Sequence, residues 1–423
     1  MTNNPRPPGA AGESGFTLIE MLITMGLTLI IMGSTLAAMN NAIRASETAT
    51  LMTNMNSGLR TAMDIMVRDM LQVGQGLPSG RTIDLPSGDG VTDVKIPGPL
   101  LSPAVTRTMP LAWDTTANSG AGAWVKPQAI TAVIPGPGLG PNGSDVITIV
   151  QADGSFLSTI SDYDVNLTDL KPDRMTVDPA TNITNGGADD LHEGDLIMLM
   201  KTSSTALVQI TKLDNPKSQT VYFEAADSLN LNQAGSGNPC NNAVDPPTGT
   251  CGTLTAHIMT APGNPASASL GEQKVGTPTP PFVPSTATRI RLVSYYLDTV
   301  TDPLRPRLVR RVNNGDPKTY NNSLGTVVAF DVEDMKITYD LVDGVTNPAG
   351  VSMTSDDLSG AAAGACKDSD GSPLPCSPNQ IRKINITLKG RSRTPLRQTR
   401  QYFRNTLTTQ VSLRSMSFMD RYK

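Results

Sequence analysis

Few residues of this 423-residue chain have the types and spacing that catalysis requires. An enzyme needs a positioned base, nucleophile or metal ion, and the chain has only two histidines, His192 and His257, in unrelated contexts. The sequence contains no Ser-His-Asp spacing, no His-Glu-x-x-His motif and no phosphate-binding loop. We therefore predict a protein that is not an enzyme and that uses no cofactor.

Two acidic segments have side chains that could bind a cation. One surrounds His192 and consists of Asp189, Asp190, Glu193 and Asp195. The other, Asp368-Ser369-Asp370-Gly371, is similar to the start of a calcium loop, but the Glu expected at the last loop position is replaced by Asn379. We interpret both segments as solvated turns and expect no metal site.

The four cysteines form two local pairs inside polar, Pro/Gly-rich stretches, at Cys240 and Cys251 and at Cys366 and Cys376. An even number of cysteines without a Cys-x-x-Cys motif is typical of an oxidising compartment and argues against zinc or thioredoxin-type chemistry. Four cysteines allow three pairings. The short loops favour Cys240 with Cys251 and Cys366 with Cys376.

The charge of the chain is distributed unevenly. Residues 380–423 hold eleven Lys/Arg against Asp420 alone, so this tail carries +10, and the net charge of −4 leaves −14 for the rest. Aromatic residues Tyr402 and Phe403 lie among the basic ones, a composition that suits phosphate and nucleic-acid contact. The candidate anionic-partner surface consists of Lys389, Arg391, Arg393, Arg397, Arg400 and Arg404. We favour the alternative that these residues lie on a solvated face or against the acidic remainder, and nucleic acid remains a secondary candidate partner.

Composition limits the classes of protein to which the chain could belong. Charged residues make up 17% and hydrophobic residues 38%, whereas 37 Gly and 33 Pro exceed average usage. These values exclude a coiled coil, a charge-rich disordered protein and a polytopic membrane protein, since each membrane span needs about 20 apolar residues. Only one such stretch exists, so a single membrane anchor with a large polar remainder fits.

That stretch follows a polar leader, residues 1–15, and runs from Phe16 to Met39. An ordinary secretory signal would place its apolar region before the cleavage site, and here the order is reversed. Glu20 is the only ionisable side chain between Phe16 and Asn41. A carboxylate in an apolar phase is costly unless it is paired, so Glu20 indicates a functional contact with a positive group.

Gly15 followed by Phe16-Thr17-Leu18-Ile19-Glu20 resembles the class III signal of type IV prepilins and secretion pseudopilins. The resemblance implies cleavage after Gly15 by a prepilin peptidase, N-methylation of Phe16, and a role for Glu20 in recruiting and registering the subunit in a filament. The alternative is a plain signal anchor with Glu20 near the membrane surface. Many major pilins have a helix-disrupting proline at the position of Ala37, which this chain lacks.

The remaining sequence predicts an α+β fold. A proline-free stretch allows a helix over 16–75, with a membrane or filament part, 16–39, and an amphipathic part, 40–75, in which apolar residues recur at helical spacing. These are Leu51, Met55, Leu59, Met63, Met66 and Met70. We interpret residues 77–143 as loop. Ten strand-like runs follow, so we expect the helix to pack on a mostly antiparallel sheet in a periplasmic or extracellular domain, 76–423, with insertions at 230–285 and 343–379.

Several later segments resemble PilW-type minor pilins more weakly. They include Arg68-Asp69-Met70-Leu71-Gln72-Val73-Gly74, the turn and strand from His192 to Leu199, and Val293-Ser294-Tyr295-Tyr296-Leu297. The resemblance implies a minor pilin that primes or caps a type IV pilus, located in the inner membrane and then at the cell surface. Its implied partners are prepilin peptidase, other minor and major pilins, the inner-membrane assembly platform, and the membrane through residues 16–39. The alternatives are a minor pseudopilin of type II secretion, or an adhesin or DNA receptor at a pilus tip.

Overall fold

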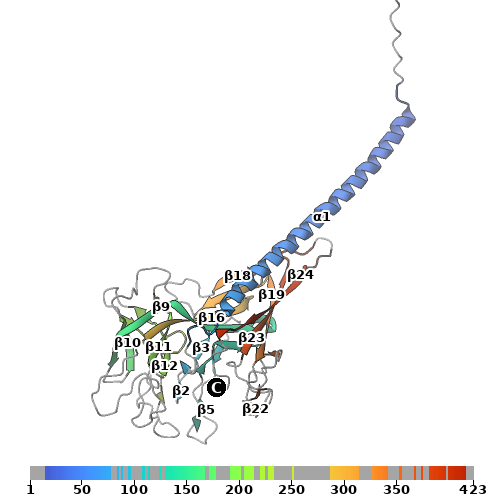
Figure 1. Ribbon diagram of the computed structural model, residues 1–423. Helices are drawn as coiled ribbons and strands as arrows, with labels where there is room; N and C mark the ends of the chain where they lie inside the picture. The colour runs from blue at the N-terminus through green and yellow to red at the C-terminus, as the bar shows by residue number, and fades with distance from the viewer. Residues whose placement is uncertain are drawn as a thin grey trace, which may run out of the picture.

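The fold was analysed on a computed structural model. The structure describes residues 15–77, 83–84, 87–88, 94–96, 107–109, 113–114, 123–124, 129–166, 171–177, 191–201, 204–213, 220–223, 227–232, 250–251, 286–313, 325–341, 352–354, 366–367, 373–374, 381–396 and 399–415. Within these ranges the chain forms one long helix and several β-sheets (Figure 1). The predicted α+β class is therefore confirmed.

The helix α1 spans Leu18–Met70. Its N-cap is Thr17, which has an extended backbone and whose side chain accepts a hydrogen bond from the Glu20 N–H, a donor that the first turn leaves without a partner. Beyond the C-cap Leu71 the backbone enters the left-handed region at Gly74 and Gly76, both at φ 71°. Only glycine adopts this conformation without strain, so the chain turns here and the helix is slightly shorter than the predicted span.

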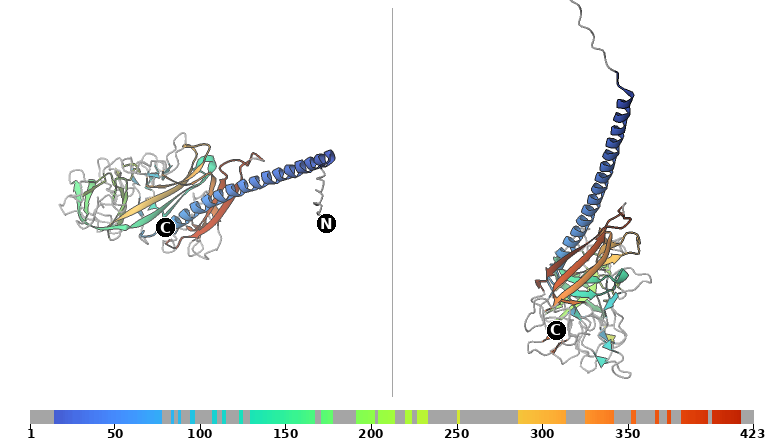
Figure 2. Two further views of the ribbon diagram at one scale, coloured as in Figure 1. Left: turned by 90° about the horizontal axis from the view of Figure 1, so that it is seen from above. Right: turned by 90° about the vertical axis from the view of Figure 1, so that its right-hand side faces the viewer.

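The two halves of α1 have different surroundings. Figure 1 shows the first half projecting alone from the β-rich body and the second half lying across it, and the views of Figure 2 agree. The stripe predicted for the second half is confirmed, since all but Leu51 of its six residues are buried. The buried apolar residues of α1 are Met55, Leu59, Ala62, Met63, Met66 and Met70.

The largest sheet has twelve strands. Its main order is β13-β14-β10-β9-β16-β11-β12-β1-β7, with β8 paired to β9, and with β17 joining β16 to β18. All neighbouring strands are antiparallel except β1 and β12. The strands are β1 (Ile83–Asp84), β7 (Ala129–Ile130), β8 (Val133–Gly136), β9 (Val146–Asn166), β10 (Lys171–Val177), β11 (Leu196–Lys201), β12 (Ser204–Gln209), β13 (Lys212–Leu213), β14 (Thr220–Tyr222), β16 (Thr286–Asp298), β17 (Arg307–Val312) and β18 (Thr326–Phe330).

A second, four-stranded sheet has the order β20-β19-β23-β24 and is antiparallel throughout. Its strands are β19 (Val332–Leu341), β20 (Ser352–Thr354), β23 (Ile381–Arg391) and β24 (Arg404–Ser412). Asp331, at φ 62°, separates β18 from β19, so the chain leaves the large sheet and enters the small one at this residue. Two-stranded pairs complete the fold: β2 (Ser87–Gly88) with β15 (Thr250–Cys251), β3 (Val94–Ile96) with β4 (Arg107–Met109), β5 (Trp113–Asp114) with β6 (Ala123–Trp124), and β21 (Cys366–Lys367) with β22 (Pro373–Leu374).

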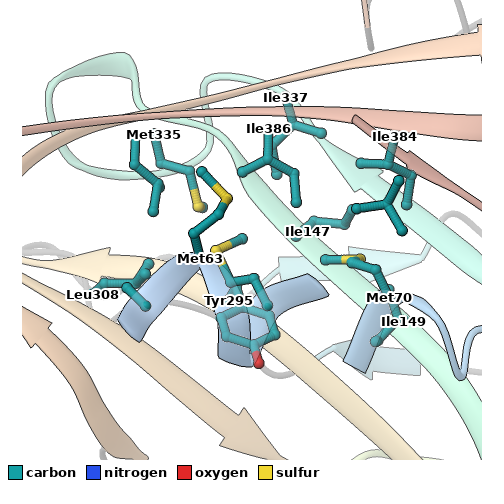
Figure 3. Close-up of a cluster of buried hydrophobic side chains, with 14 of the residues drawn as sticks. Met63, Met70, Ile147, Ile149, Tyr295, Leu308, Met335, Ile337, Ile384 and Ile386 are labelled. Atoms are coloured by element: carbon teal, nitrogen blue, oxygen red, sulfur yellow. The ribbon is translucent and has the colours of Figure 1, made fainter. Parts of the chain in front are cut away.

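Alternate side chains of the central strands enter two cores. On β16, Val293, Tyr295 and Leu297 belong to a core shared with the helix and the four-stranded sheet. Ile290 and Leu292 belong to a second core formed by the rest of the large sheet and its flanking strands. Figure 3 shows the first core, in which methionines of α1 lie between isoleucines of both sheets. The helix is therefore the layer that joins the two sheets.

The interpretation of residues 77–143 as loop is wrong in part. Val133–Gly136 forms β8 and pairs with β9, and the short strands β7 and β1 extend the far edge of the large sheet. β8 has four residues, two of which are Pro135 and Gly136, and β1 and β7 have two residues each. Strands this short show no clear period of two, which is why the sequence pattern failed here. The ten predicted strand-like runs all overlap strands of the structure.

Two glycines allow a direct test of the contact between helix and sheet. A Cβ atom added to Gly390 of β23 would lie 2.9 Å from Cδ2 of Leu59, which is buried, whereas a Cβ atom added to Gly58 of α1 would have no heavy atom within 4 Å. We expect Gly390→Val to lower the free energy of unfolding by about 1–3 kcal/mol through overpacking. Gly58→Ala is expected to raise it by roughly 0.5–1 kcal/mol through helix propensity. Denaturant unfolding of both variants checks this, and equal effects would contradict the packing shown.

Candidate functional site

The first residues of α1 form a closed set of hydrogen bonds around Glu20. The Thr17 backbone N–H and hydroxyl both donate to Glu20 Oε2, at 3.0 and 2.9 Å, and the Glu20 N–H donates to Thr17 Oγ1 at 3.3 Å. This is a capping box, which fixes the start of the helix at Leu18. The Gly15–Phe16 peptide bond therefore lies just outside the helix, in non-helical backbone.

One carboxylate oxygen of Glu20 is not used by this cap. Among the described residues, Oε2 accepts both hydrogen bonds and Oε1 accepts none. Glu20 is also exposed on the projecting half of the helix. The carboxylate can therefore receive a positive group from outside the chain without breaking the cap.

The surroundings of Glu20 are apolar and uncovered. Phe16 is 81% exposed and Leu18 82% exposed, and large apolar side chains continue around the helix to Ile43. Burying each of them would be worth about 1.5–3 kcal/mol, so this surface favours an apolar environment, which the described part of the chain does not supply. The other exposed members are Ile19, Met21, Leu22, Ile23, Met25, Leu27, Leu29, Ile30, Ile31, Met32, Leu36 and Met39.

Among the described residues, α1 is the one helix that is long and apolar enough to cross a membrane, and its apolar window is not buried in the molecule. The next ionisable residue after Glu20 is Arg44. About 20 residues of helix span the hydrocarbon core of a bilayer, and the uncharged run from Met21 to Ile43 satisfies that length.

A polar clamp fixes the opposite end of α1 to the large sheet. Buried Asp69 accepts a 2.5 Å hydrogen bond from the Tyr295 hydroxyl on β16, and it forms an ion pair with Arg310 on β17, where Nε lies 2.6 Å from Oδ2. Burial and the Asp69 carboxylate raise the pKa of Tyr295, so its hydroxyl remains a donor. Position 69 thus ties the helix to two strands at once. Sequence reasoning missed this clamp, because its members are separated by more than 200 residues.

The predicted basic surface is divided by the structure into two groups. Arg404 forms a two-point ion pair with Glu333 at 2.7 and 3.1 Å, and Arg391 lies 3.7 Å from the same carboxylate. Arg391 also stacks over the ring of Tyr402, with 4.5 Å to the ring centroid. Lys389, Arg393 and Arg400 are exposed, and Arg397 lies outside the described residues. Two of the six residues therefore face an acidic partner within the chain.

The predicted acidic segment around His192 is a turn in its described part. The His192 N–H donates to Asp195 Oδ2 at 2.9 Å, and Arg289 lies 3.7 Å from the same carboxylate. Burial raises the pKa of Asp195 despite these partners. Asp189, Asp190 and the Asp368–Gly371 segment lie outside the described residues, and within those described no cluster of metal-binding side chains occurs.

The structure describes two of the four cysteines, Cys251 and Cys366. Cys240, Cys376 and His257 lie outside the described residues. Cys366 lies on β21 opposite Leu374 of β22, two residues before Cys376, and Cys251 lies on β15 opposite Ser87. Both disulfide pairings stay predictions.

Comparison with protein families decides how the N-terminal site is interpreted. A family model described as the prokaryotic N-terminal methylation motif matches residues 11–36, which include Gly15, Phe16 and Glu20. The motif indicates a type IV pilin-like or pseudopilin-like protein. Searches of curated proteins and of solved structures found no match. A pilin-like protein is processed by a prepilin peptidase and associates with other pilins, and the exposed apolar helix fits a membrane-anchored subunit of this kind.

Proposed function

We propose that the protein is a minor pilin of the PilW type, a structural subunit that helps to prime or cap a type IV pilus. In this proposal prepilin peptidase cleaves between Gly15 and Phe16, and the new N-terminus is methylated. The subunit waits in the inner membrane, held by residues 16–39, until the assembly platform brings it together with other minor and major pilins. Its β-rich domain remains periplasmic and later lies at the cell surface.

The observation that carries this proposal is the uncovered apolar half of α1 with a single carboxylate near its start. The other half of the same helix is fixed to both sheets, so the projecting half has a defined direction relative to the body (Figure 2). A rigid apolar rod of this kind is suited first to a bilayer and then to a bundle of similar helices. Both environments bury the same side chains.

Glu20 would set the axial position of the subunit in such a bundle. Cleavage after Gly15 creates an α-amino group four residues before Glu20, and a neighbouring helix that carries the same terminus could offer its amine to the uncapped Oε1 oxygen. In an apolar bundle a single ion pair strongly disfavours every axial offset that leaves the charges apart. The Thr17 cap would hold the carboxylate in place for this contact.

The motif favours a structural, non-enzymatic subunit and does not distinguish a pilus from a secretion pseudopilus. The length of 423 residues, with two large insertions, favours the pilus interpretation, because the larger minor pseudopilins that the chain resembles are usually nearer half this size. Local disulfides Cys240–Cys251 and Cys366–Cys376 would restrain the two insertions.

A deletion strain tests the assignment. The proposal predicts that deletion removes surface pili while exoprotein release continues, and that pili sheared from the wild type contain small amounts of the protein. Loss of exoprotein release with pili intact would instead support the pseudopilin. Normal pili that no longer bind DNA or host surfaces would support the tip receptor or adhesin.

A further inference from the structure

The direction of β23 shows where the basic tail lies along the helix. In Figure 3 Ile384 lies on the Met70 side of the core and Ile386 nearer the Met63 side, and a Cβ atom added to Gly390 would contact Leu59. From the start of β23 to its end, the residues of α1 that face it therefore lie progressively closer to the helix N-terminus. Asn405 pairs with Gly390, and its side chain donates to the Asn56 side chain at 2.8 Å, so this end of both strands lies beside residues 56–59 of the helix.

Beyond these contacts the two strands continue as a hairpin. The Ser392 N–H donates to the Phe403 carbonyl at 2.7 Å, and the Leu396 N–H donates to the Gln401 carbonyl at 2.9 Å. Because Asn405 pairs with Gly390, only the four residues from Asn405 to Gln401 lie beyond that level, and at about 3.3 Å per strand residue they extend at most about 13 Å further. We name the described residues 392–396 and 399–403 the basic hairpin. It points along α1 toward the projecting half, as the red strands in Figure 2 also do.

The tip of the basic hairpin comes close to the level at which the apolar segment ends. The Asn405 side chain contacts Asn56, so about 13 Å of hairpin directed along the helix reaches at most roughly the level of Thr48. From there to Met39 is about 14 Å. A headgroup layer of about 5–7 Å and an extended arginine side chain together span most of this gap.

The charge of the basic hairpin is of one sign. Its described residues include two arginines, Arg393 and Arg400, and no acidic residue. Arg393 and Arg400 are exposed, and within the described part of the chain neither has an ion pair. The acidic neighbour Glu333 forms ion pairs with Arg391 and Arg404 at the base of the hairpin. Its charge is therefore balanced there and does not neutralise Arg393 and Arg400.

We propose that the basic hairpin binds the anionic phospholipid surface of the membrane in which α1 is anchored, before the subunit enters a filament. This inference rests on the proposed anchoring of residues 16–39. Each arginine near an anionic surface strengthens binding by roughly fivefold, and the attraction decays over about 8–10 Å in physiological salt. The contact holds the β-rich domain against the bilayer in one orientation, and extraction into the filament releases it.

Hydrogen–deuterium exchange of the full-length protein in nanodiscs tests the proposal. We expect amides of the basic hairpin to exchange roughly fivefold more slowly in discs with one third phosphatidylglycerol than in phosphatidylcholine discs. High salt and the double variant Arg393→Glu/Arg400→Glu should each abolish the difference. The matched variant Arg393→Lys/Arg400→Lys keeps the charge and should retain it.

Equal exchange of the hairpin in both kinds of disc would overturn the proposal. Protection of the hairpin by a single-stranded oligonucleotide, without an effect of phosphatidylglycerol, would overturn it in favour of nucleic acid. The same experiment tests the proposed anchoring separately, because the amides of residues 18–39 should be protected from exchange in every disc. If those residues exchange freely, the proposed anchoring fails, whereas a protected anchor with an unprotected hairpin rejects only the lipid contact.

Discussion

Glu20→Gln is expected to remove the protein from sheared pili while leaving its folding and its cleavage after Gly15 unchanged. In the proposed bundle the Glu20 carboxylate pairs with the α-amino group of a neighbouring subunit in an apolar environment. Removing one member leaves the other charge without its partner, at a cost of about 3–5 kcal/mol. Incorporation should therefore fall by roughly a hundredfold or more.

Quantitative immunoblots of pilus and membrane fractions measure this effect. Glu47→Gln is the matched control, since Glu47 lies on the same helix beyond the apolar segment and should leave incorporation unchanged. The Thr17 hydroxyl can still bond to the glutamine side chain, so loss of the cap does not explain a defect. Wild-type amounts of the Glu20→Gln protein in pili would show that Glu20 does not register the subunit.

Asp69→Ala is expected to have the largest effect on stability of any single substitution at the helix–sheet contact. It removes the acceptor of both Tyr295 and Arg310 and leaves a buried hydroxyl and a half-buried guanidinium without their partner. Breaking a buried pair in this way costs about 3–5 kcal/mol. Since the clamp joins the helix to the body, the projecting half should also lose its fixed direction.

Chemical denaturation of the full-length protein in detergent measures the loss. Asp64→Ala is the matched control, because Asp64 is exposed on the same helix and should change stability by less than about 0.5 kcal/mol. Asp69→Asn keeps a hydrogen-bond acceptor and removes the charge, so it should fall between the two. An Asp69→Ala protein as stable as the Asp64→Ala control would contradict the role assigned to the clamp.

Local patterns predicted the parts of the fold that depend on local chemistry. The helix, its buried methionine stripe and the long strands follow from periodicity and from the absence of proline between residues 16 and 73. The strand pairing could not be predicted. β9 pairs with β16, about 140 residues later, and no local pattern encodes which distant strand will bury the same face.

The candidate site was predictable to the extent that it is local. The apolar run, the lone Glu20 and the preceding Gly15 lie within a few turns of one helix, so their types and spacing were sufficient. The basic tail shows the limit of this reasoning. Its charge is visible in the sequence, but the pairing of Arg391 and Arg404 with Glu333, and the direction of the hairpin, depend on the register of β19, β23 and β24.

The mass of the N-terminal peptide tests the central claim most directly. The protein is purified from membranes with and without co-expressed prepilin peptidase, and its first peptide is measured by mass spectrometry. A pilin-like subunit should begin at N-methylated Phe16 when the peptidase is present and should retain residues 1–15 when it is absent. A chain that keeps residues 1–15 in its native host would contradict the account and would leave α1 as a simple membrane anchor.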